Sequence, residues 1–145
     1  PIVGHERSAP LGLWRNILTR AGCNFISLQY GETAGDIEAA RIAYGADVYV
    51  DGSVDPLTNA EDWFAQVAAM DLVISVDNST IQVSGAQGIP TFTLLSSAPE
   101  WRFGLAGHDH DWHPSIQVFR QSEPGNWDDA FTKLAGAFQI FLGIH

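Results

Sequence analysis

The sequence predicts a doubly wound α/β domain with a parallel, Rossmann-like sheet. Helical and strand-like periodicities alternate along all 145 residues, two strand-length runs are mostly apolar, and 46% of the residues are hydrophobic. Apolar strands are typical of parallel sheets that helices cover on both faces, and strand–helix alternation favours right-handed crossovers. We therefore expect one domain over residues 1–145, without an internal boundary.

The first half of the chain holds short strands between amphipathic helices. The first helix runs from Pro10 to Gly22 and has its apolar stripe at Leu11, Trp14, Ile17 and Leu18. The elements expected after it are a strand at 24–29, a helix from Thr33 to Gly45, a strand at 47–50 and a helix capped by Asn59.

The second half holds the most apolar strands, at 71–76 and 91–95, which we expect near the centre of the sheet. A helix at 79–87 joins them. A long connection, 96–115, leads to a short strand at 116–119. The apolar positions of the terminal helix are Trp127, Phe131, Leu134 and Phe138.

Charge and composition exclude several classes of partner. With 17 acidic and 7 basic residues the net charge is −10, which should repel nucleic acids and anionic lipid surfaces. No apolar run approaches the roughly 20 residues of a membrane span. Cys23 is the single cysteine, so no intramolecular disulfide can form. We expect a cytoplasmic protein without a cofactor.

In such sheets ligands bind beyond the carboxyl ends of the strands. The run Asp77-Asn78-Ser79-Thr80 falls between the strand at 71–76 and the next helix. Two interpretations stay open for it. Free N–H groups and hydroxyls at a helix N-terminus can hold a phosphate or diphosphate, and the same residue types form ordinary N-caps.

Two other strand-end segments carry candidate ligand residues. Gln29 and Tyr30 follow the strand at 24–29, where Tyr30 would stack on a base or simply cover the sheet edge. In the long connection, Arg102 would meet a phosphate, or stack on Trp101 or pair with a nearby acid.

The histidine-rich run at 108–113, HDHDWH, has the composition of a metal site. It lacks an HExxH or cysteine–histidine pattern, so we expect no metal there. A metal-dependent hydrolase built on this loop is the least favoured hypothesis for function.

The run at 71–80, DLVISVDNST, and its continuation at 84–90, SGAQGIP, resemble the signature of glycosyltransferase-like domains at the C-terminal end of tetratricopeptide-repeat proteins. These domains are similar to heptosyltransferases. The further matches are Arg7-Ser8-Ala9-Pro10-Leu11, residues 27–31, Pro99-Glu100-Trp101-Arg102, Phe119-Arg120-Gln121 and Gly125-Asn126-Trp127.

The resemblance implies the donor-binding C-terminal half of a GT-B glycosyltransferase, in which Ser79 and Thr80 hold the diphosphate of a nucleotide sugar. It also implies that Asp77 accepts hydrogen bonds from donor hydroxyls, that Gln29 and Tyr30 border the nucleoside, and that Arg7 adds positive charge. The implied donor-binding residues are Arg7, Gln29, Tyr30, Asp77, Asn78, Ser79, Thr80, Gln82, Gly85 and Arg102.

The chain departs from the family pattern in ways that affect function. Gln82 stands where the family has histidine, and an amide cannot titrate near neutral pH. This leaves a non-catalytic nucleotide-sugar-binding or protein-interaction module as the alternative. An acceptor domain and tetratricopeptide repeats would lie upstream in a longer protein, so we expect the chain alone to be inactive.

The family's first strand would precede Arg7, so we expect the sheet to lack it. The strands at 24–29 and 71–76 should then pair directly. Exposed sheet edges should favour a homo-oligomer.

Overall fold

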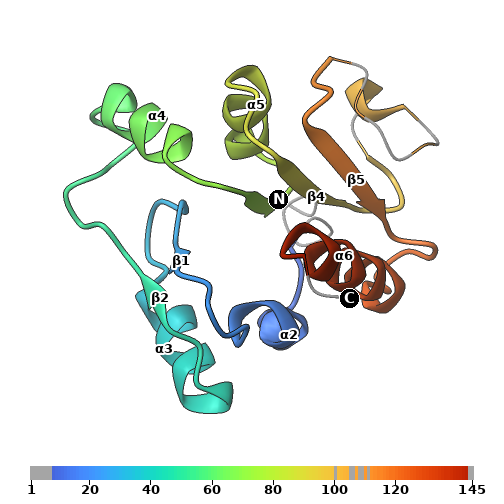
Figure 1. Ribbon diagram of the computed structural model, residues 1–145, viewed down its shortest axis with the longest axis horizontal. Helices are drawn as coiled ribbons and strands as arrows, with labels where there is room; N and C mark the ends of the chain where they lie inside the picture. The colour runs from blue at the N-terminus through green and yellow to red at the C-terminus, as the bar shows by residue number, and fades with distance from the viewer. Residues whose placement is uncertain (1–7, 100, 105–106, 108–109, 111, 144–145) are drawn as a thin grey trace. The chain divides into compact units, whose positions relative to one another are not determined.

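The computed structural model describes residues 8–99, 101–104, 107, 110 and 112–143. These residues form two compact units, one spanning residues 10–67 and the other made of the described residues outside that range. Both units contain parallel β-strands flanked by helices (Figure 1), so the chain has an α/β fold.

The unit at 10–67 holds a two-stranded parallel sheet in which β1 pairs with β2. Its elements are the 3-10 helix η1 (Leu11–Trp14), α2 (Arg15–Leu18), β1 (Phe25–Ile26), α3 (Ala34–Tyr44), β2 (Val48–Tyr49) and α4 (Ala60–Ala68), whose last residue lies beyond the unit. A long-range hydrogen bond ties α3 to η1, because the Tyr44 hydroxyl donates to the Leu11 carbonyl at 3.1 Å.

The helix ends in this unit agree in part with those predicted from the sequence. Gly45 adopts a left-handed conformation at φ 72° and ends α3, and the Asn59 side chain accepts from the Asp62 N–H at 3.4 Å before α4. Thr33 precedes α3 without a side-chain cap. The predicted helix at 10–22 is shorter in the structure, where it consists of η1 and α2 and ends at Leu18.

The other unit contains a three-stranded parallel sheet in the order β3-β4-β5. Its elements are β3 (Val73–Val76), α5 (Ser79–Ala86), β4 (Thr91–Leu95), the 3-10 helix η2 (Trp101–Phe103), β5 (Ile116–Arg120) and α6 (Asp128–Phe141). The strands predicted at 91–95 and 116–119 and the helix predicted at 79–87 are confirmed to within a residue or two.

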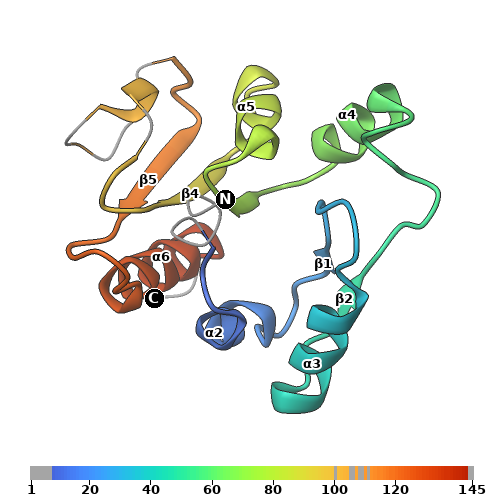
Figure 2. The same ribbon diagram turned by 180° about the vertical axis from the view of Figure 1, so that it is seen from behind.

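Helices α5 and α6 pack on opposite faces of this sheet. Thr91 donates from its hydroxyl to the Ser84 hydroxyl of α5 at 2.8 Å, while the neighbouring Phe92 meets Phe141 of α6 with ring centroids 6.1 Å apart. Adjacent residues of a strand point to opposite faces. The two views of the ribbon show the same arrangement (Figures 1 and 2), which is the layering of a doubly wound sheet.

Both faces of the sheet are sealed by apolar side chains. The core cluster on the α5 side consists of Ile81, Leu95, Phe103, Ile116 and Val118. On the other face, the predicted apolar positions of α6 and its approach are all buried: Trp127, Phe131, Leu134 and Phe138. The helical periodicity therefore identified the buried face of α6 correctly.

β1 and β3 belong to different units, so the predicted pairing of the strand at 24–29 with the strand at 71–76 stays a prediction. Within their own units, β1 pairs with β2 and β3 pairs with β4. The strand predicted at 24–29 is shorter in the structure, where β1 comprises Phe25 and Ile26.

None of the described helices is long and apolar enough to cross a membrane.

Candidate functional site

The site begins at the carboxyl edge of the three-stranded sheet. The register aligns Val76 of β3 with Leu94 of β4 and Phe119 of β5, so the residues that follow each strand reach one edge together. Asp77 follows β3 and is 7% exposed, and Gln121 follows β5 and is 5% exposed. Polar groups thus gather where parallel sheets usually bind their ligands.

Asn78 forms the N-cap of α5. Its side-chain oxygen accepts from the Thr80 N–H at 2.9 Å, and its amide nitrogen donates to the Ser75 hydroxyl at 2.9 Å. The capping interpretation of this run is therefore confirmed for Asn78. A helix has four amino-terminal N–H groups without helical partners, and this cap accounts for the one on Thr80.

The hydroxyl residues of the first turn differ in exposure. Ser79 is exposed, whereas Thr80 is buried. Ser79 is thus the hydroxyl that solvent and ligands can reach, and it lies at the positive end of the α5 dipole.

Gln82 contributes an amide donor to the same end of α5. Its Nε2 atom is buried and has no hydrogen-bond partner among the described residues. Helical side chains lean toward the helix N-terminus, so the Gln82 side chain leans toward the turn that begins at Ser79. Buried donors normally find an acceptor, and a bound oxygen would supply one here.

Gln121 presents a second buried amide at this edge. Its backbone N–H donates to the Leu95 carbonyl at 2.9 Å, and its Oε1 accepts from the Ser97 N–H at 3.2 Å. The bond from Ser97 joins the Gln121 side chain to the loop after β4, and it turns the Oε1 atom of the amide toward that loop. The Nε2 atom has no partner within the described part of the chain. Gln121 is not among the site residues predicted from the sequence, because only its burial and its hydrogen-bond partners distinguish it.

Gly85 has a packing role two turns along α5. A Cβ atom there would lie 2.6 Å from Cγ of His113 and 2.7 Å from Cδ1 of Ile116. The glycine lets the helix approach the segment that leads into β5. It lies at the opposite end of α5 from Ser79, so the structure does not bring it together with the capping run.

The long connection after β4 is held down by Arg120. Its Nε donates to the Gly107 carbonyl at 3.0 Å, its Nη1 donates to Gly104 at 3.3 Å, and its Nη2 donates to Phe103. Burial lowers the pKa of Arg120 from its usual value. With its donors engaged by carbonyls, Arg120 braces this loop, including η2 with Arg102, instead of offering itself to a phosphate.

Three of the predicted donor-binding residues lie in the unit at 10–67 or outside the described residues. Gln29 and Tyr30 belong to the unit at 10–67, where both are exposed, and the Gln29 N–H donates to the Ser27 hydroxyl at 3.4 Å. Arg7 lies outside the described residues.

The histidine-rich run supplies no metal site in the part of it that the structure describes. Among the described residues no group of three or more His, Cys, Asp and Glu side chains is placed to hold a metal ion. His108, Asp109 and Asp111 lie outside the described residues, while the His110 ring is buried against Phe103 with centroids 4.9 Å apart. That contact gives His110 a packing role.

The unit at 10–67 also contains a cavity of about 450 Å³ that the sequence did not suggest. It lies at the amino ends of β1 and β2, and its polar lining includes Arg20, Cys23, Asn24 and Asp47. This is the edge opposite to the one where parallel strands usually present ligand residues.

Comparison with curated proteins identifies a similar protein, Protein FlbA of Caulobacter vibrioides, with 32% identity over 133 residues. The match covers 92% of this chain and 22% of FlbA, so the chain spans about a fifth of that relative's length. No family model matches the chain, and no solved structure matches it.

Proposed function

We propose that this chain is the donor-binding half of a GT-B glycosyltransferase, with the diphosphate of a nucleotide sugar bound at the amino end of α5. The observation that carries the proposal is the edge formed by Ser79, Gln82 and Gln121. An exposed hydroxyl at a helix N-terminus stands there with two buried amide nitrogens that have no partner among the described residues.

The chemistry of this edge suits a diphosphate. The helix dipole contributes about 0.3 to 1 kcal/mol, and each hydrogen bond to a charged oxygen adds about 1.5 to 3 kcal/mol. Two or three such bonds offset the unfavourable approach of an anion to a chain of net charge −10. Ser79, the backbone of the first turn and the Gln82 amide would supply them.

Such a site would act on the leaving group. Negative charge grows on the departing nucleoside diphosphate in the transition state, and fixed donors aimed at it lower the barrier. Asp77, buried beside the cap, would accept hydrogen bonds from donor hydroxyls. Gln29 and Tyr30 would border the nucleoside, and Arg7 and Arg102 would add positive charge.

The acceptor site and the general base would belong to an opposing domain, with tetratricopeptide repeats further upstream. The related FlbA is several times longer than its matched stretch, as such an arrangement would require. The chain alone would then bind donor without transferring sugar. We place this protein in the cytoplasm, where nucleotide sugars are available.

Calorimetric titration with uridine diphosphate and guanosine diphosphate tests the proposal. One of the two should bind, and Ser79→Ala should weaken that binding about tenfold, as expected for one charge-assisted hydrogen bond. Thr132→Ala is the matched control, because Thr132 also carries an exposed hydroxyl but lies on α6, which packs on the opposite face of the sheet from α5. Failure of both nucleotides to bind would refute the proposal.

Gln82 favours a second candidate, a nucleotide-sugar-binding or protein-interaction module without catalysis. An amide donates hydrogen bonds but cannot shuttle a proton or carry charge near neutral pH. Donor binding without turnover in a longer protein that also has its acceptor domain would support this candidate. Gln82→His would then be the variant in which to look for restored turnover.

A further inference from the structure

The cavity at the amino ends of β1 and β2 takes no part in the proposed nucleotide site. Its volume of about 450 Å³ falls within the range of about 300 to 1,000 Å³ that is typical of small-molecule sites. Every residue that lines it belongs to the unit at 10–67, and none of them is among the residues that we assign to the nucleotide sugar. The cavity is therefore a separate candidate for ligand binding.

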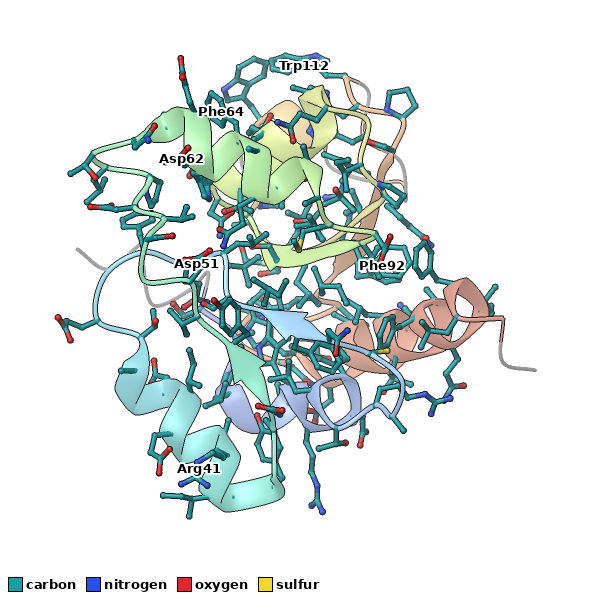
Figure 3. The ribbon with its side chains drawn as sticks, turned by 60° about the vertical axis from the view of Figure 1, so that its left-hand side comes forward. Arg41, Asp51, Asp62, Phe64, Phe92 and Trp112 are labelled. Atoms are coloured by element: carbon teal, nitrogen blue, oxygen red, sulfur yellow. The ribbon has the colours of Figure 1, made fainter. Side chains whose placement is uncertain are left out.

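Arg20 brings a positive charge to this cavity. It is half-buried, and no described residue accepts a hydrogen bond from its guanidinium or forms an ion pair with it. Two other arginines are engaged: Arg41, labelled on α3 in Figure 3, donates to Glu38 at 2.8 and 2.7 Å, and Arg120 donates to three carbonyls. Guanidinium groups bind carboxylates through two parallel hydrogen bonds. A half-buried guanidinium without an acceptor thus favours a ligand that carries a carboxylate.

Asp47 brings a negative charge to the same cavity. It is exposed, and like Arg20 it forms no ion pair or side-chain hydrogen bond with any residue that the structure describes. Arg20 and Asp47 are the charged residues of the lining. An anion alone would be repelled by Asp47 and a cation alone by Arg20, whereas a ligand that carries both charges can satisfy both side chains.

The wall of the cavity also has an apolar part. It is supplied by Leu18 of α2, by Phe25 and Ile26 of β1 and by Tyr49 of β2. Small-molecule sites typically combine such a wall with a few polar groups that fix the orientation of the ligand. An apolar group on the ligand would be stabilised there, because its contact with the wall removes apolar surface from water.

We propose that this cavity binds a zwitterionic α-amino acid with an apolar side chain. Arg20 binds the carboxylate of the ligand, Asp47 binds its ammonium group, and the apolar wall contacts its side chain. The proposal is independent of the nucleotide site, because the two sites share no residue.

Nuclear magnetic resonance titration of the 145-residue chain with L-leucine tests the proposal. Leucine should shift the backbone amide signals of Cys23 and Gly45, which line the cavity, and leave those of Ser79 and Gln82 in place. Two analogues each lack one charge: 4-methylpentanoate has no ammonium group, and 3-methylbutylamine has no carboxylate. Each should bind about tenfold more weakly than leucine, as expected for the loss of one charge-assisted contact.

Variants assign each charge of the ligand to its partner. Arg20→Gln should weaken leucine binding about tenfold without weakening that of 3-methylbutylamine, and Asp47→Asn should do the same without weakening that of 4-methylpentanoate. Arg15→Gln and Asp36→Asn are the matched controls, since they remove the same charges from exposed residues of α2 and α3 that do not line the cavity. Both controls should bind leucine as the parent does.

Three results would overturn the proposal. The first is a leucine titration that shifts neither the Cys23 nor the Gly45 signal. The second is an affinity for either analogue that equals the affinity for leucine. The third is a control variant that weakens leucine binding as much as its partner variant at the cavity, because the charge would then act at long range and not by contact.

Discussion

At the scale of single residues, the packing of α5 depends on Gly85. Its missing side chain leaves room for His113 and Ile116, which a Cβ atom would approach to 2.6 and 2.7 Å. Contacts this short force neighbouring side chains to move, and overpacking of a core costs about 1 to 3 kcal/mol.

We expect Gly85→Ala to lower the free energy of unfolding by about 1 to 2 kcal/mol, because the steric conflict exceeds the gain in helix propensity. Urea denaturation measures the change. Gly136→Ala is the control, since a Cβ atom on Gly136 of α6 would have nothing within 4 Å, and this substitution should stabilise by about 0.5 to 1 kcal/mol. If both substitutions raise the free energy of unfolding equally, the proposed packing role of Gly85 is contradicted.

The sequence indicates which polar residues follow the strands but not which groups they contact. The sequence predicts Asn78 as a cap or a ligand residue, and the structure shows the cap. The roles of Arg120 and Gln121 depend on carbonyl and N–H groups 13 to 24 residues away in the chain, and no local pattern encodes such contacts. The sequence alone does not distinguish Gly85 from any other helical glycine, because its packing role depends on His113, which is distant in the chain.

At the scale of elements, the first turn of α6 contains a carboxylate, Asp129, that accepts several hydrogen bonds. Burial raises the pKa of this carboxyl, but hydrogen bonds from Ser122 and Lys133 and from the backbone of Ala130 outweigh burial, and the pKa falls below its usual value. The Ser122 N–H donates to Oδ1 at 3.5 Å and the Lys133 ammonium to Oδ2 at 3.4 Å. Asp129 also lies in the first turn, where the helix dipole favours a negative charge.

A carboxyl whose pKa is lower in the folded state stabilises above its unfolded pKa of about 3.9, and this contribution is lost as the pH falls through the folded value. We therefore expect Asp129→Asn to destabilise by about 0.5 to 1 kcal/mol at pH 7, and the difference to vanish below the folded pKa. Urea denaturation at neutral and strongly acidic pH checks this. Lys133→Met should lower the free energy of unfolding by less, since an exposed ion pair contributes little. If the difference between the parent and Asp129→Asn does not change with pH, the proposed role of the Asp129 charge is contradicted.

Long elements were easier to predict than short ones. The period of Phe131, Leu134 and Phe138 identifies α6 because fourteen residues repeat the signal, and the short run of threonine, phenylalanine and leucine in β4 predicts the strand whose five residues are all buried. The strand expected at 24–29 reduces to Phe25–Ile26, since its extent depends on β2, which itself has two residues. Periodicity describes one segment at a time, whereas a strand exists only with its neighbour.

At the scale of the whole molecule, β3 is an edge strand of its three-stranded sheet. Among the described residues it has β4 as its one ladder partner, and its apolar run is typical of a parallel strand whose sheet is covered on both faces. Unpaired apolar edges are templates for pairing with another chain. We therefore propose that the isolated chain self-associates through β3.

The backbone geometry of β3 suggests a specific test of self-association. The Val73 N–H donates to the Pro90 carbonyl toward β4, and successive N–H groups of a strand alternate in direction, so the N–H of Ile74 points to the open edge. Ile74→Pro removes that donor while leaving the ladder with β4 in place, because proline is tolerated where an edge N–H faces outward.

Light scattering over a concentration series should show oligomers for the parent chain and monomers for Ile74→Pro at matched thermal stability. Ile140→Lys removes an apolar side chain that is 70% exposed on α6, away from any strand edge, and should still associate. A parent chain that remains monomeric at every concentration would rule out association through β3, and loss of association in Ile140→Lys alone would assign it to the surface of α6.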